Sequence, residues 1–272
     1  MTGSGTAADT AITMIATDLD GTLLGADQAV SERTVAALRA ATAEGIHVVA
    51  ATGRGWSAAL PPLAPTGVIE LAACSNGAVL YDVAAQRVDL AREITGDVAR
   101  AAAEALHGAV DGVGFAWETI DGYGCDARFA AAHPEFAAIT TGTDGLSAID
   151  AAIKLFIGVD DLDGVAVQRL LEPLAPPTIT ISTSGAPFVE ATAAGVDKAS
   201  GLALIAERLG VDPTGVIAFG DQLNDVPMLR WAGRSVAMGN AHPEIAALCS
   251  EVTASHDRDG VAIVIERILE QR

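Results

Sequence analysis

The sequence predicts an α/β protein whose core is a doubly wound parallel sheet, interrupted by an inserted α+β domain. Near both ends of the chain, short apolar runs that stop at polar residues alternate with helical patterns. Between about residues 79 and 188 this alternation is lost. The length of 272 residues is long for one average domain and short for two, as expected for a core that carries an insertion.

The first part of the core is expected from three apolar runs, residues 12–17, 46–51 and 69–74. Each run is short, rich in residues that favour strands, and ends at a polar residue. Between the first two runs, Ser31 is expected to cap a helix that ends at Gly45. This strand and helix order predicts parallel strands joined by helices.

The middle of the chain has a different pattern. Strands are expected at residues 113–118, 152–158 and 178–182, and helices at residues 98–107 and 165–174. Polar residues no longer follow each strand. We therefore assign this part to a separate α+β domain.

The α/β alternation returns near residue 198. We expect a helix over residues 198–209, a strand over residues 216–219, a helix through Trp231, a strand over residues 235–238 and a last helix that runs to Glu270. The simplest arrangement is one core sheet that is built from both ends of the chain.

These patterns divide the chain into a core of residues 11–80 and 190–272, an inserted domain of residues 81–189, and a disordered tail of residues 1–10. The first ten residues lack a signal-peptide pattern, and no apolar run approaches the roughly 18 residues of a membrane span. Three cysteines without a CxxC pair fit a reducing compartment. We expect a cytoplasmic protein with no membrane partner.

The formal net charge of −19 excludes some classes of partner. Nucleic-acid binding requires clustered Lys and Arg, and no such cluster occurs. The same charge repels anionic substrates at long range. A phosphate ester would therefore need a local positive site, such as a metal ion with one or two basic side chains.

Polar clusters fall at the ends of the predicted core strands or at a helix start. In open parallel sheets, ligands bind in the crevice outside the carboxyl ends of the strands. Gathered there, these clusters would supply carboxylates, a lysine, a hydroxyl and glycine-rich backbone, which suit a hard cation and a phosphate. The clusters are residues 18–22, residues 52–54, Lys198 and residues 220–225.

These clusters resemble, in order, the four motifs of the haloacid dehalogenase superfamily. The matching segments are DLDGTLL from Asp18, ATGR around Thr52, GVDK ending at Lys198, and GDQLND from Gly220. The SNGA and AMGNA segments resemble its Cof-like, sugar-phosphatase branch. Gln222 departs from the small residue that many relatives carry. The resemblance covers the core and implies a Rossmann-like fold with a large α/β cap, for which the middle of the chain gives only architectural support.

The resemblance implies a Mg²⁺ site and a set of catalytic residues. The metal ligands would be Asp18, the backbone carbonyl of Asp20 and Asp221, with Asp225 as a further ligand or as support. Asp18 would be the nucleophile, and Asp20 would exchange protons with the leaving alcohol and with water. Lys198 would also keep Asp18 ionised.

The phosphoryl oxygens would be held by Thr52, by Lys198 and by the backbone amides of Leu19 and Gly53. Further contacts with the phosphate or the substrate are candidates rather than assignments. Arg54 and Asn76 fit a substrate contact as well as a salt bridge or a turn, and Asn224 fits a ligand contact as well as a helix cap. Lys154, in an apolar strand of the inserted domain, fits a leaving-group contact as well as a strand-edge or snorkelling role.

The sequence therefore predicts a Mg²⁺-dependent phosphatase that hydrolyses a small phosphate monoester, such as a sugar phosphate, through an aspartyl-phosphate. Asp20 favours ester hydrolysis or phosphomutase chemistry, because superfamily ATPases carry threonine there and phosphonate-cleaving members lack the acid. Two alternatives stay open: a phosphomutase of the same fold and a catalytically silent protein that binds phosphorylated metabolites. The oligomeric state is left open between a monomer and a small homo-oligomer.

Overall fold

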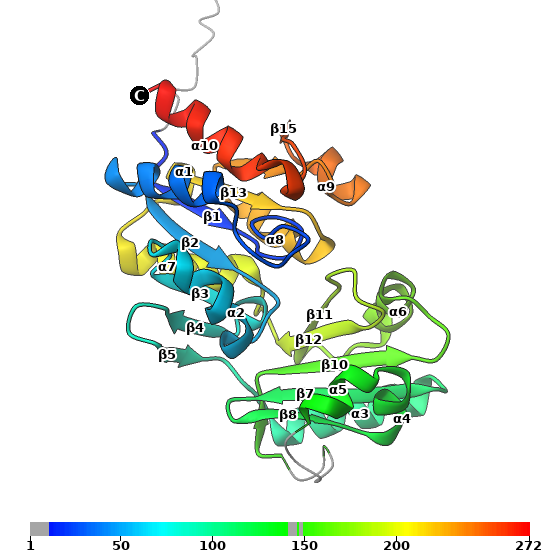
Figure 1. Ribbon diagram of the computed structural model, residues 1–272. Coiled ribbons are helices and arrows are strands. Elements are labelled where there is room, and N and C mark those ends of the chain that lie inside the picture. The colour runs from blue at the N-terminus through cyan, green and yellow to red at the C-terminus, as the bar shows by residue number, and fades with distance from the viewer. Residues whose placement is uncertain (1–10, 141–145, 147–148) are drawn as a thin grey trace, which may run out of the picture.

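The computed structural model describes residues 11–140, 146 and 149–272. Its largest element is an eight-stranded sheet (Figure 1). The strands are parallel from β15 to β3, and β4 and β5 continue the sheet in antiparallel fashion. In spatial order they are β15 (Glu251–Val252), β14 (Arg234–Ala237), β13 (Val216–Gly220), β1 (Met14–Thr17), β2 (His47–Ala51), β3 (Leu71–Cys74), β4 (Val79–Asp82) and β5 (Arg87–Ala91).

Helices cover both faces of the large sheet. The strands present apolar side chains to both faces in alternation: Ile15 belongs to one buried cluster, and Met14 and Ala16 belong to the other. The first face carries α1 (Glu32–Ala43), α2 (Trp56–Leu63) and α10 (Gly260–Glu270), and the second carries α7 (Lys198–Leu209), α8 (Val226–Trp231) and α9 (Pro243–Leu248). This layering confirms the predicted doubly wound α/β core.

A second sheet of five antiparallel strands forms the cap, which lies beside the carboxyl edge of the core (Figure 1). Its spatial order is β11 (Ile179–Ser182), β12 (Val189–Ala193), β10 (Lys154–Val159), β7 (Val113–Thr119) and β8 (Gly122–Cys125). A short pair, β6 (Ile94–Thr95) and β9 (Ala151–Ala152), lies at its start. The predicted α+β character of the insertion is thus confirmed.

The two faces of the cap sheet differ. One packs through mainly aliphatic residues, with Phe115 and Trp117, against α3 (Gly96–Ala109) and α6 (Gly164–Leu171). The other packs through phenylalanines against α4 (Ala127–Ala132) and α5 (Pro134–Ile139). Lys154 and Phe156 point to this second face, because alternate residues of β10 share a face. The second face therefore combines aromatic rings with charge.

The large sheet does not end at residue 80. The β4–β5 hairpin continues it to Ala91, and β12 keeps the returning chain in the cap sheet to Ala193. We therefore propose a core of residues 11–91 and 194–272 around a cap of residues 92–193. The expected tail, residues 1–10, lies outside the described residues. Within the ranges described, no helix has both the length and the apolar character needed to span a membrane.

Candidate active site

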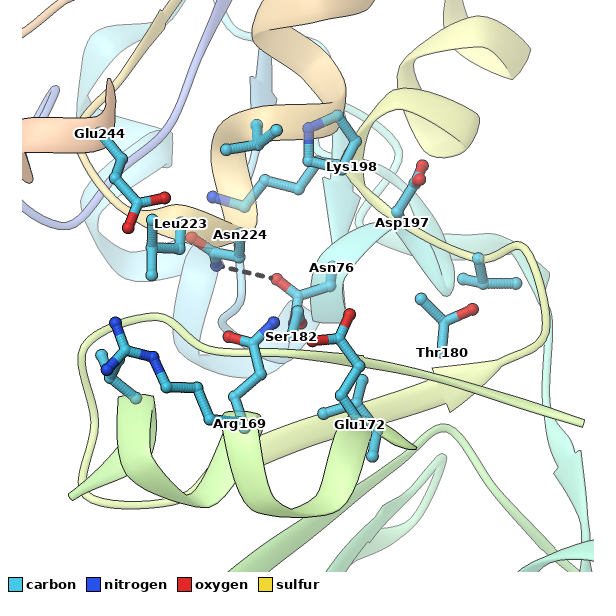
Figure 2. Close-up of a pocket in the computed structure, with 16 residues that line it drawn as sticks. Asn76, Arg169, Glu172, Thr180, Ser182, Asp197, Lys198, Leu223, Asn224 and Glu244 are labelled. Carbon is cyan, nitrogen blue, oxygen red and sulfur yellow. Dashed lines mark hydrogen bonds between the residues drawn. The ribbon is translucent and has the colours of Figure 1, made fainter. Parts of the chain in front are cut away.

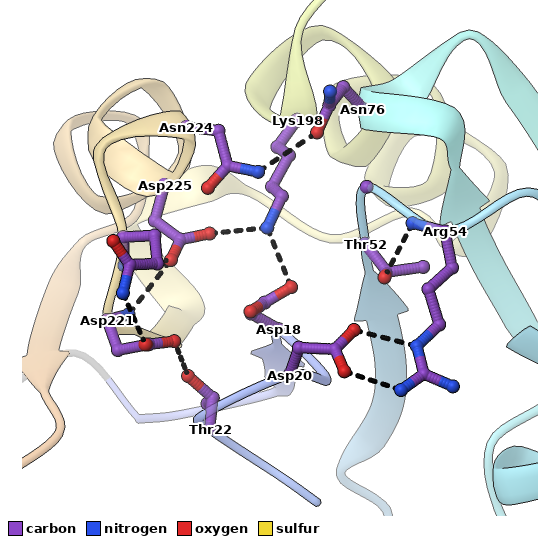
Figure 3. A network of polar contacts seen from close by, with 12 residues as sticks. Asp18, Asp20, Thr22, Thr52, Arg54, Asn76, Lys198, Asp221, Asn224 and Asp225 are labelled. Carbon is purple, nitrogen blue, oxygen red and sulfur yellow. Dashed lines mark hydrogen bonds and ion pairs between the residues drawn. The ribbon is translucent and has the colours of Figure 1, made fainter. Parts of the chain in front are cut away.

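The polar residues expected at the strand ends meet at one edge of the large sheet (Figure 3). Asp18 follows β1, Thr52 follows β2 and Asp221 follows β13, and these strands are neighbours. Parallel neighbours end on the same side, so the residues that follow them share a crevice. Helix α7 adds Lys198 at its first position, where the Asp197 side chain caps the helix.

Lys198 is the positive centre of this crevice. Its side chain is 1% exposed, and its Nζ donates to Asp18 Oδ1 at 2.7 Å and to Asp225 Oδ1 at 2.6 Å. A buried ammonium requires such direct partners. Although burial opposes its charge, Asp18 and Asp225 together raise the pKa of Lys198 above its ordinary value.

Asp221 completes a compact acidic cluster. Its Oδ1 accepts a hydrogen bond from Thr22 Oγ1 at 2.8 Å, and its backbone N–H donates to Asp225 Oδ2 at 2.8 Å. Carboxylate oxygens of Asp18, Asp221 and Asp225 all lie within 4.8 Å of one another. Three carboxylates thus surround a single lysine, which leaves the cluster with excess negative charge when all three are ionised.

The pKa values of the cluster reflect this excess. Burial raises the pKa of Asp18 well above its ordinary value, and Asp225 and Asp221 add to the rise against the pull of Lys198. Burial, and then the charge of Asp225, raise the pKa of Asp221 to about 6. Lys198 alone therefore does not offset these effects at Asp18. A divalent cation suits these hard oxygen donors and would favour their ionised forms.

Gly21 allows the loop after β1 to approach this cluster. Its φ is +75°, and a Cβ at this position would lie 2.4 Å from Asp221 Oδ2. Any other residue would clash with the carboxylate and would strain the left-handed backbone. The glycine of the DLDGT segment is therefore required by the position of Asp221.

Asp20 turns away from the cluster and pairs with Arg54 (Figure 3). Arg54 Nε donates to Asp20 Oδ2 at 2.7 Å, and Nη2 donates to Oδ1 at 2.5 Å. Arg54 also bonds Gln28. Arg54 was predicted to contact the substrate or to form a salt bridge, and in the structure it forms the salt bridge. The pair lines the same cavity as Asp18, so it remains beside the position of a bound substrate.

The loop after β2 contributes mainly backbone. Thr52 is buried, and its Oγ1 accepts from the Arg54 N–H at 3.1 Å. Gly53 lines the cavity with Asp18, and its carbonyl accepts from Lys154 Nζ at 2.6 Å. The Leu19 side chain is buried in the apolar core, so that only its backbone can serve the site.

Asn76 and Asn224, both candidates for substrate contact, bond each other. Asn224 Nδ2 donates to Asn76 Oδ1 at 3.1 Å, and Asn76 Nδ2 donates to Glu190 Oε2 at 2.9 Å. Ser75 and Asn76 both adopt left-handed φ values, 50° and 55°. This strained turn holds Asn76 between the core and the cap.

Lys154 is buried in the central strand of the cap sheet, so it is neither a strand-edge nor a snorkelling residue. Its Nζ donates to Glu190 Oε1 at 2.6 Å and lies 3.9 Å from Glu118 Oε2. Ser75 Oγ donates to the other oxygen of Glu118 at 2.8 Å. We call Lys154, Glu118 and Glu190 the cap lysine cluster, and Lys198 with Asp18, Asp221 and Asp225 the core lysine cluster.

Glu118 and Glu190 were not predicted from the sequence, and no role was predicted for Thr22. A signal for the two glutamates was present. Each is the single acidic residue within an apolar strand, in VGFAWET and FVEATA, and a lysine occupies a third apolar strand nearby in KLFIGV. Charges placed in apolar strands need partners, so they are expected to pair with one another.

Two cavities adjoin the site. One of about 380 Å³ is lined by Asp18, Asp20 and Arg54 and by aromatic residues of the cap. The other, of about 370 Å³, lies between α6 and the start of α7 and shares Asn224 with the first (Figure 2). The nucleophile candidate Asp18 lines only the first cavity, so a reacting ester would occupy that one.

Comparison with known proteins identifies the family. A family model of haloacid dehalogenase-like hydrolases matches residues 15–265. The chain belongs to this family. The phosphatase YwpJ of Bacillus subtilis (strain 168) is 28% identical over 94% of this chain and 99% of its own length. The 5-amino-6-(5-phospho-D-ribitylamino)uracil phosphatase YcsE of the same organism is 28% identical over 94% and 96%.

Solved structures agree with this assignment to the haloacid dehalogenase-like hydrolases. BT1666 from Bacteroides thetaiotaomicron, described among phosphatases of this superfamily, has a TM-score of 0.80 at 25% identity and covers 98% of this chain and 99% of its own. The subclass IIB sugar phosphatase BT4131 has a TM-score of 0.77 at 24% identity, covering 94% and 98%. The predicted fold class, the resemblance to the Cof-like, sugar-phosphatase branch and the phosphatase class are confirmed.

Proposed function

We propose that this phosphatase depends on Mg²⁺ and hydrolyses a small phosphate monoester, a sugar phosphate or a similar metabolite, through an aspartyl-phosphate at Asp18. The observation that carries the proposal is the core lysine cluster, whose carboxylate oxygens lie within 4.8 Å of one another. A carboxylate attacks a phosphate dianion only when nearby cations neutralise the charge. The cluster supplies an ammonium and a set of hard oxygen ligands.

Mg²⁺ would be held by the carboxylates of Asp18 and Asp221 and, by family resemblance, by the backbone carbonyl of Asp20. Asp225 is better suited to a supporting role. Its Oδ1 accepts from Lys198, and its Oδ2 accepts from two backbone N–H groups. When bound, Mg²⁺ neutralises charge between the nucleophile and the phosphoryl oxygens.

The chain's own residues account for both chemical steps. An oxygen of Asp18 forms a bond to phosphorus while the bond from phosphorus to the alcohol oxygen breaks, and Asp20 gives the leaving alkoxide a proton. Water then attacks phosphorus and gives a proton back to Asp20, and the bond to Asp18 breaks to restore the carboxylate. Lys198 and Thr52, with the backbone amides of Leu19 and Gly53, hold the phosphoryl oxygens.

Arg54 holds Asp20 before a substrate binds. Both oxygens of the Asp20 carboxylate accept from the Arg54 guanidinium, so this side chain must leave the pair to reach the leaving oxygen. A phosphate monoester in the cavity that both residues line would compete for the guanidinium and free the Asp20 side chain to move.

The test is phosphate release from p-nitrophenyl phosphate and a panel of sugar phosphates, with and without Mg²⁺. Asp18→Asn is expected to abolish release and to prevent a phosphoryl adduct that mass spectrometry detects on the acid-quenched wild-type protein. Asp111→Asn, which neutralises an exposed carboxylate, is the matched control and should retain activity. An undiminished rate in Asp18→Asn would refute the proposal.

The same assay separates the alternatives. A phosphomutase would need a bisphosphate activator and would release little free phosphate. A silent binding protein would stay at background on every ester. The complete set of Asp18, Asp20, Thr52, Lys198 and Asp221 supports the hydrolase, because a silent protein has no need of both a nucleophile and an acid.

A further inference from the structure

The cavity above Asp18 has a wall that suits a flat apolar group. Resting on the proposed function, we propose that the alcohol part of the substrate carries an aromatic or similarly flat apolar ring, and that this ring packs against Phe136, Phe156 and Phe188. The alcohol oxygen would then lie toward Asp20, which lines the same cavity.

The three rings form one rigid surface. Their centroids lie 4.8 Å apart for Phe136 and Phe156, 5.5 Å for Phe136 and Phe188, and 5.6 Å for Phe156 and Phe188, all in edge-to-face geometry. Each ring is buried, yet each lines the cavity. Aromatic pairs prefer this geometry, so a substrate ring that enters the cavity can pack edge-to-face against these phenylalanine rings. Tyr123 and Ile139 extend the wall.

The charged groups nearest the wall have little hydrogen-bonding capacity to spare. Lys154 Nζ donates to Gly53 O and Glu190 Oε1, and it lies 4.6 Å from the centroid of the Phe156 ring. The other oxygen of Glu190 accepts from Asn76. A polyol placed against these rings would lose hydrogen bonds to water without gaining replacements. An apolar ring would lose none.

Polar groups remain available nearer the phosphate end. Gln222 and Ser184 line the cavity, and Asn224 Oδ1 is buried and accepts no hydrogen bond from any described residue. These groups suit one or two polar substituents close to the ester oxygen. The cavity volume of about 380 Å³ falls in the range of small-molecule sites. The cavity therefore combines an apolar wall with polar groups, of which Gln222 bonds Asp221 of the core lysine cluster.

The wild-type protein tests the proposal directly. Benzyl phosphate is compared with glycerol 3-phosphate and ribose 5-phosphate, because all three release a primary alcohol and differ mainly in the group that meets the wall. We expect kcat/KM for benzyl phosphate to exceed that of both polyol esters by about tenfold or more. Equal or higher values for the polyol esters would overturn the inference and leave the proposed function intact.

A matched pair of variants locates the effect. Phe136→Leu removes a ring that lines the cavity, whereas Phe129→Leu removes a ring of the same cluster that does not. The ratio of kcat/KM for benzyl phosphate to that for glycerol 3-phosphate should fall about fivefold in Phe136→Leu, mainly through KM, and stay at the wild-type value in Phe129→Leu. An unchanged ratio in Phe136→Leu, or an equal fall in both variants, would contradict the inference.

Binding gives a readout that does not depend on turnover. With Mg²⁺ present, Asp18→Asn should bind benzyl phosphate more tightly than glycerol 3-phosphate in calorimetry, and the reverse order would refute the ring wall. Failure of the proposed function has a different signature. In that case wild-type protein releases no phosphate from any ester, including p-nitrophenyl phosphate, and both proposals fall together.

Discussion

The two lysines of the chain are both buried among carboxylates, but they lie in different parts of the molecule and meet different demands. Lys198, in the core, forms ion pairs with Asp18 and Asp225 at the end of the parallel sheet, and Asp221 lies beside these carboxylates. Lys154, in the cap, faces two glutamates and a backbone carbonyl of the core. Both clusters reach the same cavity, through Asp18 and through Lys154 and Glu190, but the core lysine cluster holds three carboxylates for one ammonium, whereas the cap lysine cluster holds two and also binds the core through the Gly53 carbonyl. We infer that the first serves chemistry and the second joins the cap to the core.

The largest expected difference between the clusters is in catalysis. Lys198→Met should lower phosphate release by about 10³-fold, because it removes the charge that holds the phosphoryl group. Lys154→Met should cost only about tenfold, through displacement of the Gly53 loop. Steady-state rates at saturating Mg²⁺ measure both. Equal losses in the two variants would show that the proposed division of roles is wrong.

The second expected difference is in stability. Lys154→Met leaves Glu190 buried without its cation, so the free energy of unfolding should fall by about 3 kcal/mol in urea titrations. Adding Glu190→Gln, which removes the buried charge that has lost its cation, should recover part of the lost free energy of unfolding. A double variant that loses the full sum of the two single losses would indicate that the residues do not interact.

Mg²⁺ offers a third way to separate the clusters. At a free concentration about a hundredfold above its Kd, Mg²⁺ should stabilise the wild-type protein by about 2.7 kcal/mol. Thermal unfolding with and without Mg²⁺ measures the effect. Asp221→Asn should abolish it, because a ligand is lost, whereas Lys154→Met should show the full shift. A shift of wild-type size in Asp221→Asn would show that Mg²⁺ does not bind at the core lysine cluster.

The contrast between the clusters also explains what the sequence could predict. The core site was predicted because Asp18, Thr52 and Asp221 each follow a short apolar strand, and parallel strands bring their carboxyl ends together whatever the intervening chain does. The local sequence pattern was therefore sufficient to predict the core site. The place of Lys198 in the site was predicted from the expected start of a helix that packs on the same sheet.

The cap could not be predicted in this way. Its antiparallel strands pair through register, and no local pattern shows that Lys154 lies opposite Glu118 or that Asn76 meets Glu190. The β4–β5 hairpin was missed because β5 is an exposed edge strand with no apolar run. The salt bridge of Asp20 with Arg54 joins two loops, so it too depended on the assembled fold.

The smallest expected effect lies within the cap lysine cluster and concerns pH. Burial raises the pKa of Glu118 above its ordinary value, although Lys154 and Ser75 oppose the rise. The folded protein therefore holds this proton more tightly than the unfolded chain. Ionisation of Glu118 then costs stability as the pH rises from the unfolded pKa through the higher folded pKa.

Glu118→Gln removes this ionisation and keeps an oxygen that can accept from Ser75 Oγ. The free energy of unfolding of the variant, minus that of the wild type, should increase as the pH rises from about 4, near the unfolded pKa of a glutamate, to about 8. Urea titrations across this range measure the difference. Glu104→Gln, at an exposed carboxylate of α3, is the control and should give a flat difference. A difference for Glu118→Gln that falls with pH would mean that Lys154 and Ser75 stabilise the carboxylate as an anion, which would contradict the raised pKa of Glu118.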